Sequence, residues 1–198
     1  MAVGKKGEAK KLKIIQSASY CLCHYGDKGA TFQAIAKHCQ VSQASVVKYL
    51  GSVDNIFPTV LNYWLGYARK KTEVELELPG TPEEKLRRYL KISVNIFFAH
   101  PDICKIYLML HYFAAVNERY KVINSDIKTT AQARIAQMIQ AGIDNHSFIK
   151  VDVRATAKTI HNNLTGLLIA SVTELKKPSD LHLADFFEDY SLSLVLKK

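Results

Sequence analysis

Residues 30–57 read ATFQAIAKHCQVSQASVVKYLGSVDNIF, and this stretch is the most informative part of the chain. Apolar residues recur at helical spacing in two short runs, 32–36 and 44–50. Thr31 and Ser42 precede these runs, and both are residue types whose hydroxyl accepts an unpaired backbone N–H at the start of a helix. The few residues between the two runs suit the tight turn of a helix-turn-helix unit. The sequence therefore predicts a helix-turn-helix motif.

The second helix of such a motif presents its first residues to a DNA major groove. Gln43 is able to pair with adenine, Lys48 with guanine or a phosphate, and Tyr49 with a phosphate. Thr31 and Ser42 have the alternative role of helix caps only. We expect the DNA-binding residues to be Thr31, Gln33, Ser42, Gln43, Ser45, Lys48 and Tyr49.

Residues 14–61 resemble the N-terminal DNA-binding region of TetR-family transcriptional regulators, without a gap. The matching positions are Gly26 at the end of the first helix, Thr31, Ile35 and Ala36 in the second, Val41 and Ser42 at the turn and cap, Tyr49 and Leu50 at the end of the third, and Ser52 before the fourth. The resemblance implies an all-helical homodimer that binds operator DNA. It also implies that a small molecule in the C-terminal domain releases the DNA.

Positive charge is concentrated near the N-terminus. The net charge is +9, and the first 60 residues hold eight lysines against three acidic residues. This is where a polyanion is expected to bind. We interpret the five lysines between Lys5 and Lys13 as a basic arm that follows phosphates or the minor groove, with a solvated tail as the alternative.

The remaining composition is that of an ordinary globular protein, with 48% hydrophobic and 23% charged residues. No apolar run approaches the roughly 18 residues of a membrane span, and no signal-peptide pattern follows the first lysines. We therefore expect a cytoplasmic protein with no membrane contact. Nucleophile–base pairs, phosphate-binding glycine loops and metal-binding spacings are not evident, so we expect neither an enzyme nor a bound cofactor.

Helix breakers divide the chain into an all-α arrangement. The expected helices span residues 12–25, 32–38, 42–49, 53–71, 81–99, 103–116, 120–143, 152–177 and 181–196. The alternation at 73–78 is interpreted as a helix end or linker. We expect a DNA-binding domain at 1–52, a connecting helix and linker at 53–78, and a helical-bundle domain for ligand binding and dimerisation at 79–198.

The last two expected helices have apolar surface suited to pairing. A band of apolar residues surrounds Gly166, a small residue that permits close helix approach, and Phe186, Phe187 and Tyr190 supply apolar surface on the last helix. The resemblance implies that these helices form a four-helix bundle across a dimer axis, and an intramolecular core is the alternative. Two-fold symmetry is what two DNA half-sites require.

Aromatic residues are frequent at 89–113, where an interhelical pocket would suit a small apolar or aromatic effector. His161, Asn162 and Asn163 are possible polar anchors, although aromatic residues at helical spacing are more often core. The expected ligand-binding residues are Tyr89, Phe97, Tyr107, His111, Tyr112, Asn162 and Asn163.

The four cysteines suggest a second mode of control. They are Cys21, Cys23, Cys39 and Cys104, and we expect free thiols in a reducing compartment. An exposed thiolate at Cys39 would sense oxidants. The alternative function is therefore a DNA-binding regulator controlled by cysteine redox chemistry or by a protein partner. Cys21 and Cys23 point about 200° apart on a helix and do not suit a shared zinc ion.

Overall fold

The computed structural model describes residues 5–174 and 180–197, and all regular structure in these ranges is helical. The chain forms two compact units, Met1–Tyr67 and Ala68–Lys198. The elements are α1 (Lys5–Gly29), α2 (Phe32–Cys39), α3 (Gln43–Leu50), the 3₁₀ turn η1 (Val53–Asn55), α4 (Ile56–Glu77), α5 (Pro82–Ala99), α6 (Pro101–Val116), α7 (Glu118–Asp144), α8 (Val153–Thr173) and α9 (Asp180–Ser193). The all-α fold class is thus confirmed, and the unit boundary falls inside α4.

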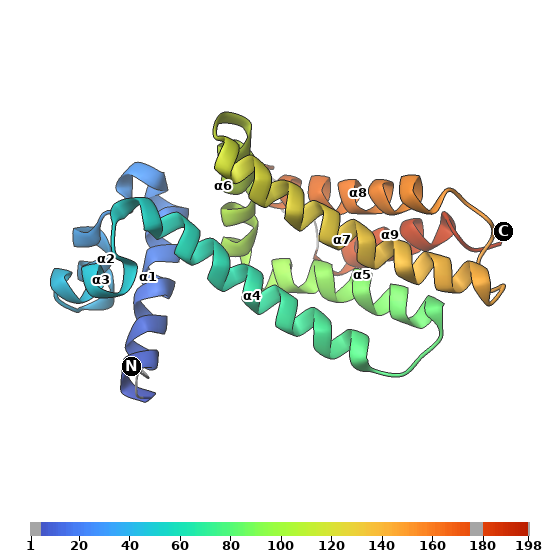
Figure 1. The fold of residues 1–198 in the computed structure, drawn as a ribbon, viewed down its shortest axis with the longest axis horizontal. Coiled ribbons are helices and arrows are strands. Elements are labelled where there is room, and N and C mark those ends of the chain that lie inside the picture. The colour runs from blue at the N-terminus through green and yellow to red at the C-terminus, as the bar shows by residue number, and fades with distance from the viewer. Residues whose placement is uncertain (1–4, 175–179, 198) are drawn as a thin grey trace. The chain divides into compact units, whose positions relative to one another are not determined.

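In the first unit, α2 packs against both α1 and α3 (Figure 1). Its core includes Ile14, Leu22, Ile35 and Val46, all at most 2% exposed. The φ angle of Gly26 is 72°, a left-handed value that glycine adopts without steric cost, and it interrupts α1 where the sequence predicted a helix end. The indole nitrogen of Trp64 on α4 donates to the Ser19 hydroxyl at 2.9 Å.

The expected basic arm is wrong as a separate element. Lys6, Lys10, Lys11 and Lys13 belong to α1, which begins at Lys5. Lysine, alanine and glutamate are good helix formers, and Glu8 lies in the first turn, where the helix dipole favours a negative charge. The N-terminal lysines therefore project from a helix.

In the second unit, α5, α7, α8 and α9 run along one another and α6 crosses them near one end (Figure 1). Fully buried leucine and isoleucine side chains form the core: Leu86, Leu90, Ile106, Leu110, Ile135, Ile139 and Ile160. A capping box begins α5, because Thr81 accepts from the Glu84 N–H and Glu84 accepts from the Thr81 N–H. This helix matches its predicted range.

Several predicted helix ends are displaced. The fourth helix starts later, after η1, and continues to Glu77, because glutamate and leucine favour helix and Arg69 donates to Glu73 one turn away at 2.7 Å. Helix α8 ends at Thr173, and the expected continuation to 177 enters residues outside those described. Helix α9 ends at Ser193, since the Val195 carbonyl accepts a hydrogen bond from the Ile149 N–H at 2.9 Å.

Candidate nucleic-acid interface and ligand site

The short helix α3 is fixed at both ends. The Ser42 hydroxyl accepts from the Ser45 N–H at 3.3 Å, and Gly51, at φ 76°, ends the helix. Before it, Gln40 adopts a left-handed φ of 53° and forms the turn after α2. Val46 and Leu50 anchor the inner side of α3 in the core. The helix-turn-helix predicted from the sequence is present.

The outer side of α3 is open to solvent. Gln43 and Lys48 are exposed, whereas Ser45 and Tyr49 are partly exposed. Val47 is 40% exposed, because α3 buries only Val46 and Leu50. An exposed valine on this face is chemically suited to the methyl group of thymine.

Thr31 and Ser42 are both helix caps. The Thr31 hydroxyl accepts from the Ala34 N–H at 3.1 Å at the start of α2, and Gln33 is exposed in the first turn of the same helix. The two hydroxyls thus have a structural role, and their contact with DNA stays a prediction.

The sequence reasoning missed a contact between α1 and α3. Lys10 Nζ donates to Ser45 Oγ at 2.9 Å, and Ser45 Oγ lies 3.0 Å from Ser42 Oγ. An ammonium group therefore lies beside the first turn of α3. The only sequence signal was the lysine cluster, because the contact joins residues 35 positions apart.

The candidate ligand residues separate into two groups. Tyr89 and Tyr107 are buried, the ring of Phe97 lies 6.0 Å from that of Tyr107, and His111 Nδ1 lies 2.9 Å from the Tyr107 carbonyl oxygen. Burial raises the pKa of the Tyr107 and Tyr89 hydroxyls. In contrast, Tyr112 is 64% exposed.

Asn162 and Asn163 are also exposed on α8, and their contact with a ligand stays a prediction. The buried polar residue of this segment is the neighbouring His161, at 4% exposure. Both of its ring nitrogens lack a hydrogen-bond partner. Burial, with Lys128 and His111 nearby, lowers the pKa of His161 from 6.5 to about 4. Helical phase explains the difference, because adjacent residues point about 100° apart.

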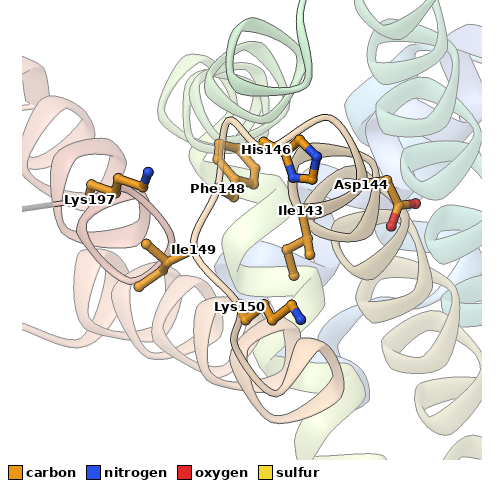
Figure 2. A pocket seen from close by; sticks show the side chains of 7 residues that line it. All are labelled: Ile143, Asp144, His146, Phe148, Ile149, Lys150 and Lys197. Carbon is orange, nitrogen blue, oxygen red and sulfur yellow. The ribbon is translucent and has the colours of Figure 1, made fainter.

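A separate surface hollow lies where α7 ends and the chain turns toward α8. Figure 2 shows its lining, from which Ile143, Phe148 and Ile149 supply apolar surface, and its volume is about 550 Å³. His146, Lys150 and Lys197 bring basic groups to it, and Asp144 brings an acid. Gly142 is required beneath it, since a Cβ there would overlap the buried ring of Phe148.

The cysteines are mostly buried. Cys21, Cys39 and Cys104 are at most 3% exposed, and Cys23 is partly exposed. Burial raises the pKa of the Cys21 and Cys104 thiols, which lowers their thiolate content. This geometry gives no support to oxidant sensing at Cys39.

The fold is similar to that of several solved regulators. A protein from Saccharomonospora viridis, assigned as a transcriptional regulator and solved with choline, has a TM-score of 0.86 at 18% identity, covering 96% of this chain and 100% of that one. A TetR transcription regulator from Haloarcula marismortui ATCC 43049 has a TM-score of 0.83 at 20% identity, with coverage of 96% and 100%. AibR, solved with isovaleryl coenzyme A and operator DNA, has a TM-score of 0.72 at 15% identity, with coverage of 91% and 97%.

No family model and no curated protein matches this sequence. The likeness is therefore one of structure, and it extends over nearly the whole chain. The chain has the fold of TetR-family transcriptional regulators. This confirms the fold that the residues around the helix-turn-helix implied. Within the described residues, no helix is both long and apolar enough to cross a membrane.

Proposed function

We propose that the protein is a DNA-binding transcriptional regulator and not an enzyme, and that it represses transcription until a small molecule releases it from its operator. The observation behind this proposal is the outer face of α3. Gln43 and Lys48 project from a helix whose start is capped and whose inner side is buried. Such a helix is rigid enough to present donors to base edges.

Two features support DNA as the partner. Lys10 adds an ammonium group beside Ser45, and the basic excess of the first 60 residues favours a polyanion. Operator DNA accompanies AibR in its crystal structure, over which 91% of this chain aligns.

The proposed homodimer forms through α8 and α9. On α9, Phe186 is 68% exposed and Tyr190 is 42% exposed, and their rings stack 6.4 Å apart. On α8, Gly166 is exposed, and a Cβ there would meet no atom within 4 Å. Two exposed aromatic rings on α9 and an exposed glycine on α8 suit a self-complementary interface.

Oligomeric state in solution tests the dimer. We expect Phe186→Glu to shift the mass measured by light scattering from dimer to monomer, because burying a carboxylate in an apolar interface is costly. Tyr112→Glu on α6 is the matched control, since Tyr112 is similarly exposed, at 64%, but lies outside the proposed interface. If the unsubstituted protein has the mass of a monomer, the proposed interface is wrong.

The function is tested by selecting, from a random library of DNA duplexes, those that the purified protein binds at near-physiological salt. A recovered pseudo-palindrome supports a dimer that reads sequence. Recovery without sequence preference, abolished by moderate salt, would instead mean generic binding by the lysines and would contradict the proposal.

A small-molecule effector completes the proposal. Two of the similar structures contain a ligand, choline in one and isovaleryl coenzyme A in the other. In this chain the interior between α5, α6 and α8 brings Tyr89, Phe97, Tyr107 and His111 into one neighbourhood, which suits a ligand with an apolar or aromatic portion. A ligand releases DNA only if it binds more tightly to the conformation that does not bind DNA than to the one that does.

A further inference from the structure

His161 is a buried imidazole for which the protein supplies no hydrogen bond. A neutral imidazole has one donor and one acceptor nitrogen, and both nitrogens of His161 lack partners although the side chain is 4% exposed. Leaving such a group unpaired in an interior is costly. Its hydrogen bonds must therefore come from outside the protein, from a water molecule or a ligand.

The residues around His161 come from three helices. On α8, Thr165 lies one turn after His161 and donates to its carbonyl oxygen at 3.0 Å. On α6, Tyr107 pairs with Thr165, and His111 stands one turn after Tyr107. Helix α6 packs against both α7 and α8, so these polar groups share one interhelical space.

Helix α7 completes this space with a second polar stripe. Asn124 and Lys128 are one turn apart and therefore lie on the same side of the helix. The buried side-chain oxygen of Asn124 also has no partner. Lys128 acts electrostatically on His161, which places its ammonium group on the side of α7 toward α8.

The groups that act on His161 are basic. Burial is the main factor that disfavours a positive charge on His161, and the two groups that add to it are Lys128 and His111. His111 Nδ1 must donate to the Tyr107 carbonyl, because a carbonyl oxygen only accepts. The ammonium group of Lys128, near the imidazoles of His161 and His111, attracts an anion. Hydrogen bonds from an ammonium group to an anion are stronger than hydrogen bonds between neutral groups.

We propose that His161 and Lys128 bind the carboxylate of an amphipathic acid inside the bundle, with the apolar portion of the ligand against Tyr107 and Phe97. The inference rests on the proposed ligand-responsive function and names its effector class. His161 donates one ring N–H to a carboxylate oxygen, and Lys128 provides the counter-charge. The Asn124 amide, rotated about its last bond, donates from its nitrogen.

Calorimetric titration of the full chain with decanoate, decanol and decylamine tests this inference. These probes share one apolar chain and differ in the head group. We expect decanoate to bind at least about tenfold more tightly than decanol, since charge-assisted hydrogen bonds are about twice as strong as neutral ones. Equal affinities, a preference for decylamine, or no binding of decanoate at millimolar concentration would overturn the inference.

Substitutions locate the head group. His161→Phe and Lys128→Met are each expected to weaken decanoate binding about tenfold while leaving decanol binding unchanged. His161→Gln, which keeps a donor and an acceptor, should retain more affinity than His161→Phe. Circular dichroism of each variant verifies folding.

The matched controls lie in the surface hollow of Figure 2, which also has basic groups above apolar surface. His146→Gln and Lys150→Met should leave decanoate binding unchanged. Loss of binding in these variants, with none in the His161 and Lys128 variants, would place the anion in the hollow and overturn the inference. Operator binding is measured in a separate experiment. If the protein binds DNA and an uncharged molecule releases it, the proposed function holds and this inference is wrong.

Discussion

Buried polar groups are treated differently in the two units. In the first unit, the buried Ser17 and Ser19 hydroxyls pair with His38 at 3.0 Å and Trp64 at 2.9 Å. In the second, the buried His161 and Ser191 side chains have no partner. Among the described residues, all buried unpartnered side-chain nitrogen and oxygen atoms belong to the second unit: those of Arg88, Asn124, His161 and Ser191.

This difference corresponds to where each unit is proposed to meet its partner. The first unit has a satisfied interior and places Gln43 and Lys48 outside, as a surface that reads DNA requires. The second unit has buried polar atoms without a protein partner, which the proposed internal ligand would supply with hydrogen bonds. The unit whose buried polar groups are paired is thus the one proposed to bind DNA at its surface, and the unit with unpaired buried groups is the one proposed to bind a ligand inside.

The largest expected effect comes from matched core truncations in the two units. Ile35→Ala and Ile139→Ala each remove a fully buried side chain, and each should lower the free energy of unfolding by about 2–5 kcal/mol. Trp64 is the single tryptophan and lies in the first unit, so its fluorescence follows that unit, whereas circular dichroism follows mainly the longer helices of the second. We expect Ile35→Ala to shift chiefly the fluorescence transition and Ile139→Ala chiefly the dichroism transition. If both signals shift together in both variants, the chain unfolds as one block and the comparison between units fails.

The buried His161 is expected to make the stability of the second unit depend on pH. Its pKa is lowered to about 4 in the folded chain, so the unfolded chain binds more protons between there and its ordinary value of 6.5. Stability contributed by this group is fully present above that window and decreases as the pH falls, by up to about 1.4 kcal/mol per pH unit. His161→Gln should flatten this slope in urea unfolding measured across the window. An identical slope in the variant would show that His161 is not buried as the structure has it.

Lys48→Ala is expected to weaken duplex binding without affecting the bundle. The loss should be about 1–3 kcal/mol for a base contact, or a decrease of about one unit in the salt slope for a phosphate contact. Fluorescence anisotropy at several salt concentrations distinguishes these cases. Lys158→Ala on α8 changes the net charge equally and should leave binding unaltered. Unchanged binding by Lys48→Ala would remove Lys48 from the interface.

The smallest effect is expected from matched helix caps. Ser42→Ala removes the cap of α3 and Asp152→Ala the cap of α8, and each should cost about 1 kcal/mol of stability. Only Ser42→Ala should also weaken DNA binding, since α3 holds the proposed interface. Equal effects on DNA binding from the two variants would contradict the assignment of separate tasks to the two units.

Local chemistry made much of the fold predictable from the sequence. Thr31 and Ser42 are caps as expected, and Gly26 interrupts α1 as expected. Each of these depends on a residue type and its neighbours within one helical turn. The N-terminal lysines were misjudged because their charge suggested an arm, whereas their helix propensity decided the structure.

The helix-turn-helix, the all-α class and the approximate helix positions could be predicted from the amino-acid sequence, because caps, breakers and apolar spacing act within a few residues. Which polar groups are buried depended on how the helices pack. This packing placed Asn162 and Asn163 outside and His161 inside, and it brought Lys10 to Ser45 and Lys128 toward His161. Those choices depend on the rotation and packing of helices far apart in the chain, which periodicity does not specify.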